Sequence, residues 1–172
     1  MYQKDKIRIR IPHKKLKDGG EYAKMLEKIM KEKISADHLL YVSLKYTKTC
    51  DVILNLIRRW GFMINDSVDG LLDKAKKKKK IKSIPAAPRQ RIELVKVEFK
   101  KVPEVMKTME LYEFFKRIDN LKTIRESEFR KDVRLRIEDN GQEIIINLDK
   151  LKEYAATLES FISYVKQFLL SK

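Results

Sequence analysis

The sequence predicts a mainly helical α+β protein, an antiparallel bundle of five to six helices with a small three-stranded antiparallel sheet. Two observations support this fold class. Apolar residues recur at steps of three and four over long segments, which is the spacing of a buried helix face. Elsewhere, short segments alternate polar with apolar side chains, as half-buried strands do. A length of 172 residues suits a single domain covering residues 1–172.

The N-terminal part of the chain predicts one strand and one short helix. Residues 6–11, KIRIRI, place three isoleucines on one face, and Pro12 ends the strand. After two glycines, residues 21–33 carry apolar side chains at helical spacing. We therefore expect the strand 6–11 to be the third strand of the sheet.

The next two predicted helices form an antiparallel hairpin. Residues 37–60 carry an apolar seam at steps of three and four, with Asp37 as the expected N-cap. Gly61 is expected to end this helix, because glycine is a poor helix former. A second helix at 64–80 then folds back, since a connection of three residues allows only antiparallel neighbours.

A basic, proline-containing connector at 76–91 separates this hairpin from the rest of the chain. Pro88 suits the first turn of a helix that runs to about Phe99. Pro103 begins a longer helix, which the pattern extends as far as Phe129.

The clearest local signal is Asn140–Gly141, a turn typical of two-residue β-hairpins. Strands at 131–138 and 142–148 follow from it. Counting outward from the turn places Ile137 opposite Ile144 and Leu135 opposite Ile146, with the apolar side chains on one face. The last helix follows, with Asp149 as its expected cap and an apolar face as regular as that of the first long helix.

Composition limits the cellular setting and the chemistry. The single cysteine, Cys50, excludes an internal disulfide and is expected to be a small buried residue. No apolar run is long enough for a transmembrane helix or a signal peptide, so a cytoplasmic protein is expected. Abundant Lys and Glu with few Gln and Asn indicate a thermophile bias, which raises the background of surface lysine.

Catalytic motifs are absent from the sequence. No glycine-rich phosphate loop and no nucleophile motif occur, and His13 and His38 are the only histidines. Asp37 and His38 could form a proton-transfer pair, but a helix cap beside a surface histidine is the expected arrangement. We therefore predict a non-enzymatic protein with no catalytic residue, no metal and no cofactor.

The net charge of +15 is concentrated in KAKKKKKIKSIPAAPRQR, residues 74–91, which holds nine cations and no acid. Adjacent lysines cover every side of a helix end, and no aromatic residue interleaves with them. We therefore expect this segment to bind the phosphates of a polyanion without any dependence on base sequence. The candidate residues are Lys76, Lys77, Lys78, Lys79, Lys80, Lys82, Arg89 and Arg91.

A second basic set lies at 116–136, where arginines interleave with acids. The planar guanidinium matches phosphate geometry, so these arginines could clamp a nucleic-acid backbone. The alternative is an ion-paired surface, as mixed charges at helical spacing usually form. The candidates are Arg117, Arg125, Arg130 and Arg134.

The helical hairpin, the proline-broken connection, the Arg-rich late helix and the closing helix resemble the HEPN superfamily over about residues 37–170. That resemblance implies a small helical bundle that binds or acts on RNA, or pairs with a nucleotidyltransferase. HEPN ribonucleases carry an Arg and a later His with four to six residues between them. Residues 122–124 after Arg117 and 130–132 after Arg125 contain no histidine, which argues against that chemistry. The stretches DHLLYVSLKYTKT, IPAAPRQR and EFRKDVRL are also similar to an archaeal family, a resemblance that implies no function.

These observations predict a basic helical protein that binds nucleic acid, RNA in preference, through sequence-independent phosphate contacts. One alternative is a protein-interaction module or homodimer whose basic loop meets an acidic partner. A second alternative is a HEPN-like ribonuclease.

Overall fold

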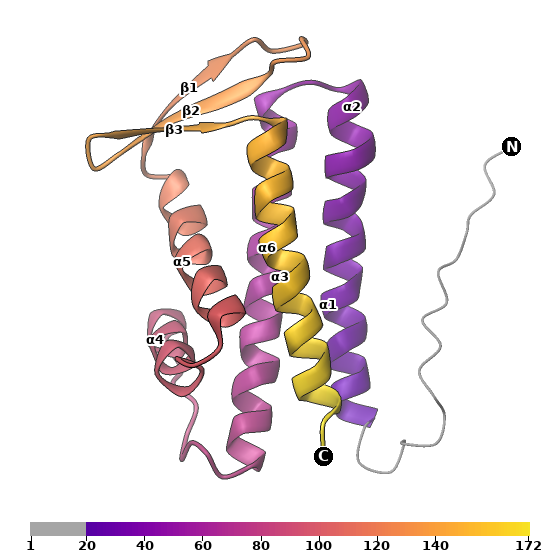
Figure 1. The fold of residues 1–172 in the computed structure, drawn as a ribbon, viewed down its shortest axis with the longest axis vertical. Coiled ribbons are helices and arrows are strands. Elements are labelled where there is room, and N and C mark those ends of the chain that lie inside the picture. Colours follow the sequence, from indigo (N-terminus) through magenta and orange to yellow (C-terminus); the bar gives the residue numbers. More distant parts are fainter. Residues whose placement is uncertain (1–19) are drawn as a thin grey trace, which may run out of the picture.

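A computed structural model describes residues 20–172, and Figure 1 shows their arrangement. The described residues form long, roughly parallel or antiparallel helices with a three-stranded antiparallel sheet across one end. The predicted fold class, mainly helical with a small sheet, is confirmed. The strand predicted at residues 6–11 lies outside the described residues.

The first helical segment is longer than the sequence pattern predicted. α1 (Gly20–His38) continues without interruption into a short π-helix, η2 (Leu39–Ser43), and then into α2 (Leu44–Tyr46). The predicted break before residue 37 was wrong, because no glycine or proline interrupts the segment and Ala36 is fully buried. Asp37 is therefore not an N-cap, and its carboxylate instead accepts a hydrogen bond from Lys33 at 2.8 Å.

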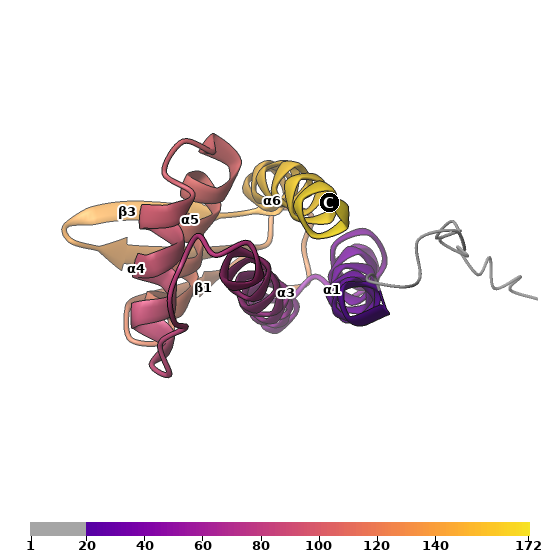
Figure 2. The same ribbon diagram turned by 90° about the horizontal axis from the view of Figure 1, so that it is seen from below.

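α3 (Cys50–Lys77) is the central helix of the bundle, lying between α1 and the α4–α5 side with α6 against it (Figure 2). It passes straight through Gly61, so the predicted end there was wrong. Glycine costs a helix about 1 kcal/mol. The next two residues, Met63 and Ile64, are 1% and 0% exposed, and burying such side chains contributes more than that cost. The hairpin is thus formed by α1 to α2 and the whole of α3.

Prolines begin the next two helices, as predicted. α4 (Pro88–Glu98) and α5 (Pro103–Ile118) each carry proline in the first turn, where no intrahelical N–H is required. α5 ends at Ile118, so the predicted extension to Phe129 was wrong. The segment beyond it turns at residues 119–121 and becomes a strand.

That strand, β1 (Lys122–Glu126), is the third strand of the sheet. It pairs antiparallel with β2 (Arg134–Asp139), which pairs antiparallel with β3 (Gln142–Ile146). The predicted hairpin register is confirmed, with Ile137 opposite Ile144 and Leu135 opposite Ile146, although both strands are shorter than predicted. The backbone φ angles of +51° and +76° at Asn140 and Gly141 match the turn that this dipeptide favours.

α6 (Leu148–Leu170) closes the bundle by packing against α3, α5 and α1. The Asn147 side chain caps it by accepting a hydrogen bond from the Lys150 amide at 2.9 Å, so the cap predicted at Asp149 was wrong. Aromatic rings join the layers, for example Trp60 of α3 and Phe115 of α5, whose centroids are 6.0 Å apart. None of the helices in residues 20–172 combines the length and apolarity that crossing a membrane requires.

Substitution of the two glycines of α3 tests whether the helix is continuous through them. Replacing Gly61 with Ala should raise the free energy of unfolding by about 0.5–1 kcal/mol, because a Cβ at this helical position meets no atom within 4 Å. Urea unfolding followed by circular dichroism measures the change.

Gly70→Ala is the matched control on the same helix. Its Cβ would lie 3.2 Å from Leu169 Cδ1, so part of the helix-propensity gain should be lost. A destabilised Gly61→Ala variant would show that α3 is not a continuous helix at this residue.

Candidate nucleic-acid interface

Most of the predicted binding residues lie at opposite ends of the bundle. α3 is 28 residues long, about 42 Å, and its N-terminus lies at the sheet end while its C-terminus carries the lysines. Apart from Arg89 and Arg117, which line one hollow, the lysine-rich set from Lys76 to Arg91 and the arginine set from Arg117 to Arg134 are therefore not brought together on one face. Each set has to be judged by its own contacts.

Three of the nine cations in residues 74–91 pair with carboxylates or cap the end of α6, and Lys78 donates a hydrogen bond to the Ser171 hydroxyl at 3.0 Å. Lys74 is 8% exposed and donates hydrogen bonds to the Leu169 and Ser171 carbonyls, which close the C-terminus of α6. Lys77 pairs with Glu21 at 2.5 Å, and this hydrogen bond raises the pKa of Lys77. Arg91 pairs with Asp69 at 2.6 Å and donates to the Pro85 carbonyl. These three side chains therefore have partners within the fold and are not free to bind a phosphate.

The other six cations of this segment have no carboxylate within 4.0 Å in the part of the chain that the structure describes. They lie at the end of α3, in the connector 78–87 and at the first turn of α4. We call this set the lysine end. It consists of Lys76, Lys78, Lys79, Lys80, Lys82 and Arg89.

Aromatic rings accompany these lysines, although none interleaves with them in sequence. The ammonium groups of Lys78 and Lys80 lie 5.3 Å and 5.8 Å from the centroid of the Phe168 ring of α6. Lys77 lies 4.7 Å from the Tyr22 ring of α1. Local sequence gave no signal of these neighbours, because the ends of α1, α3 and α6 meet only in the folded bundle.

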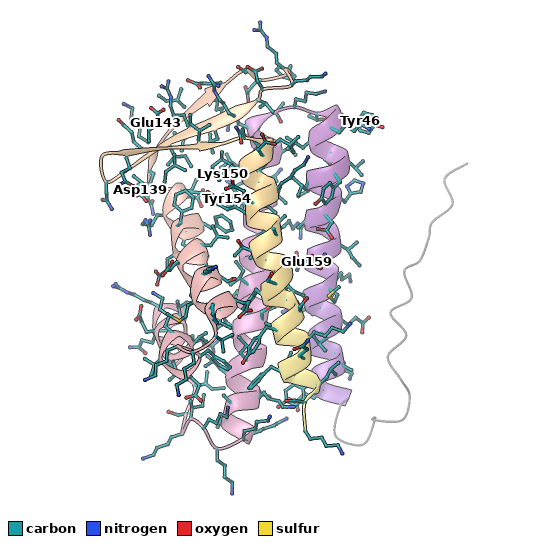
Figure 3. The ribbon with its side chains drawn as sticks, viewed as in Figure 1. Tyr46, Asp139, Glu143, Lys150, Tyr154 and Glu159 are labelled. Atoms are coloured by element: carbon teal, nitrogen blue, oxygen red, sulfur yellow. The ribbon has the colours of Figure 1, made fainter. Side chains whose placement is uncertain are left out.

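The arginine set is mostly ion-paired, as the alternative interpretation proposed. Arg117 pairs with Asp139 at 2.7 Å, and Arg134 pairs with Glu126 at 2.7 Å. Arg130 is exposed and has no carboxylate partner among the described residues. Asp139 and Glu143 lie at this sheet end (Figure 3), where acids and arginines alternate.

Arg125 belongs to the packing around the start of α3. It pairs with Asp51 at 2.8 Å and lies 3.6 Å from Glu128. Glu128 in turn accepts a hydrogen bond from the Cys50 amide at 3.0 Å and so caps the N-terminus of α3, where a negative charge is favourable. The guanidinium of Arg125 is therefore engaged with carboxylates of the fold, so it is not free to bind a phosphate.

The candidate proton-transfer groups do not form a catalytic arrangement. His38 Nδ1 lies 3.4 Å from the Ser43 hydroxyl, and Asp37 pairs with Lys33. Cys50 is fully buried, as predicted, and burial raises the pKa of its thiol. Within residues 20–172, no three His, Cys, Asp or Glu side chains cluster as metal ligands would.

Three adjoining hollows cross α1, α3, α4 and α5, and their α3 residues fall between 54 and 65, in the part of that helix nearer the sheet. The first, between α1 and α3, has a volume of about 630 Å³ and shares Arg58 and Phe62 with the second, of about 310 Å³. The second shares Pro88, Tyr112 and Lys116 with the third, of about 610 Å³. We call the three together the transverse groove. None of its lining residues comes from α6.

The transverse groove brings together cations that the sequence placed in separate sets. Arg89 and Arg117 line its third hollow, on α4 and α5, beside Lys116. Arg58 and Arg59 of α3 were missed by the sequence reasoning, because two arginines within a long helix carry no local signal of function. Comparison with known protein families, characterised proteins and solved structures finds no match to this chain.

Lys74 provides a test of which lysines are structural. Lys74→Met should lower the free energy of unfolding by about 1–3 kcal/mol, because the buried Leu169 carbonyl and the partly buried Ser171 carbonyl lose their donor. Lys76→Met, two residues away on the exposed side of α3, should change stability by less than about 0.5 kcal/mol. Equal effects in urea unfolding would contradict the assignment of Lys74 as the internal cap.

Tyr154 of α6, labelled in Figure 3, should make the folded protein less stable at alkaline pH. Burial, with a smaller contribution from Glu153, raises the pKa of Tyr154 from 10.0 to about 12. Between these pH values the hydroxyl ionises in the unfolded chain but not in the folded one. Stability is therefore lost as the pH rises from about 10 to about 12.

Tyr154→Phe should make this pH dependence shallower by up to about 1.4 kcal/mol per pH unit, the contribution of one proton. Urea unfolding at several alkaline pH values measures it. Tyr46→Phe, at a ring that is 74% exposed (Figure 3), is the control for loss of a surface tyrosine. An unchanged slope in Tyr154→Phe would refute the assignment.

Proposed function

We propose that this protein binds nucleic acid, RNA in preference, through phosphate contacts that do not depend on base sequence. The lysine end carries the proposal, since its six cations lie within 14 residues of one another in the sequence, from Lys76 to Arg89, without carboxylate partners among the described residues. Clustered cations that are not neutralised within the fold attract a polyanion and release its counterions on binding. Thermophile-type surface lysines, by contrast, are expected to form ion-pair networks.

A flexible single strand suits the lysine end better than a rigid duplex. The lysines leave the helix in several directions, and Lys79 adopts a left-handed backbone conformation with φ +57°. A duplex presents its phosphates along a fixed surface, whereas a single strand can follow the connector from Lys78 to Arg89. Single-stranded RNA is therefore the first ligand to test.

The ribonuclease alternative gains no support from the geometry. His38, the one histidine among residues 20–172, lines a hollow with Arg58 and Arg59 and not with Arg117 or Arg125. An acid–base reaction needs two such groups within reach of one bond. We therefore retain the non-enzymatic proposal.

A protein-interaction module is the second candidate, and one observation favours it. Tyr41 and Tyr46 are 57% and 74% exposed on the first arm of the hairpin, and Val42 lies next to Tyr41 in the sequence. Exposed aromatic residues on one segment are common at protein interfaces. Light scattering that shows a strict monomer would remove the homodimer version of this candidate.

The lysine end can be tested by neutralising it without disturbing the cap at Lys74. The variant replaces Lys76, Lys78, Lys79, Lys80 and Lys82 with Gln, and fluorescence anisotropy measures the affinity for a single-stranded RNA at several salt concentrations. Six phosphate contacts predict a log–log salt slope of about −4 for the natural protein. Five lost contacts should bring the slope of the variant close to −1.

A matched control removes the same charge from exposed lysines on other helices that have no carboxylate partner among the described residues. Its substitutions to Gln are at Lys24, Lys31, Lys107, Lys152 and Lys166. This control should keep most of the affinity and most of the slope. An equal loss in both variants would show that net charge alone, and not the lysine end, causes binding.

A further inference from the structure

Phe62 is the exposed aromatic residue of α3. Its side chain is 54% exposed, while its neighbours Met63 and Ile64 are buried. It lines both the first and the second hollow of the transverse groove, so its ring lies at the border between them. An aromatic ring with this much exposure leaves a face available for a flat ligand.

Two arginines accompany Phe62 on the same side of α3. Arg58 and Arg59 precede it by four and three residues, the spacing of neighbours on a helix surface. Their side chains are 55% and 46% exposed. All three residues line the first hollow, and no carboxylate does.

The internal contacts of these arginines leave guanidinium donors available. Arg58 lies 3.8 Å from Asp119 and donates to the Asn55 side chain at 3.3 Å, both long distances. Arg59 contacts Glu32 at 3.2 Å through one nitrogen. A guanidinium carries five N–H donors, so each arginine can still bind a phosphate oxygen.

We propose that the hollow between α1 and α3 is a base-binding subsite for single-stranded nucleic acid. An unpaired base stacks on Phe62, and Arg58 and Arg59 bind the flanking phosphates. Stacking on an aromatic side chain requires a base that is not already paired, so the subsite distinguishes single strands from duplexes. This inference rests on the proposed function, which it makes more specific.

The opposite wall of the hollow supplies polar groups and an irregular backbone. His38 of α1 lines it across from α3, and the π-helix η2 begins at the next residue. Isolated π-helical turns occur often at functional sites. Asn55 of α3 offers an amide that can hydrogen-bond the edge of a stacked base.

The transverse groove connects this subsite to the lysine end. Pro88, which ends the connector, lines the second hollow together with Arg58 and Phe62. Along α3, Phe62 and Lys76, the first residue of the lysine end, are 14 residues or about 21 Å apart. At about 3.4 Å per nucleotide, a strand of roughly seven nucleotides reaches from one to the other.

The experiment uses a 12-nucleotide oligouridine carrying one 2-aminopurine, whose fluorescence is quenched when the base stacks. With the natural protein, binding should quench the fluorescence. Phe62→Ala should abolish the quenching and weaken binding of the single strand about 5- to 100-fold. The affinity of the Phe62→Ala variant for a 12-base-pair RNA duplex should equal that of the natural protein. A Phe62→Trp variant, which has an aromatic ring at this position, should quench the fluorescence as the natural protein does.

Phe129→Ala is the control, since Phe129 is 78% exposed at the sheet end and should have no effect. The inference is overturned if Phe62→Ala quenches and binds as the natural protein does. If that result accompanies a loss of binding in the lysine-end variant, the proposed function stands without the subsite. If the natural protein binds neither oligonucleotide, both are refuted.

Discussion

The burial of α3 is the constraint on which the rest of this structure depends. Every other helix of the described bundle packs against it, and β2 contacts it near its start. Because α3 spans the length of the bundle, it also fixes where the charged segments lie (Figure 1). The same helix carries Phe62, Arg58 and Arg59 on its exposed side, so the packing that stabilises the fold also presents the candidate site.

The distribution of acids decides which cations remain available. Near the sheet, Asp139, Glu126 and Asp51 take arginine partners, because a planar guanidinium and a carboxylate form strong hydrogen-bonded pairs. Among residues 76–89, six cations have no such partner in the described part of the chain. The arginines of the sheet end, which could have clamped a nucleic-acid backbone, are therefore mostly engaged in ion pairs.

What the sequence could predict depended on how local the determining interactions are. The Asn140–Gly141 hairpin and its register were predictable, because the turn and the alternation lie within a few residues. The passage of α3 through Gly61 was not, since burial against other helices outweighed a local preference. Similarly, β1 became a strand through pairing with β2. The spacing of apolar residues along α3 did not reveal that Phe62 lies on the side that no other helix covers.

The central claim is that single-stranded RNA follows the connector into the transverse groove. Ultraviolet crosslinking of a uridine-rich strand to the full-length chain, with mass-spectrometric mapping, tests this most directly. The account predicts crosslinks at Phe62 and within residues 76–91. Crosslinks confined to the sheet, residues 122–146, with none on α3 or the connector, would contradict it.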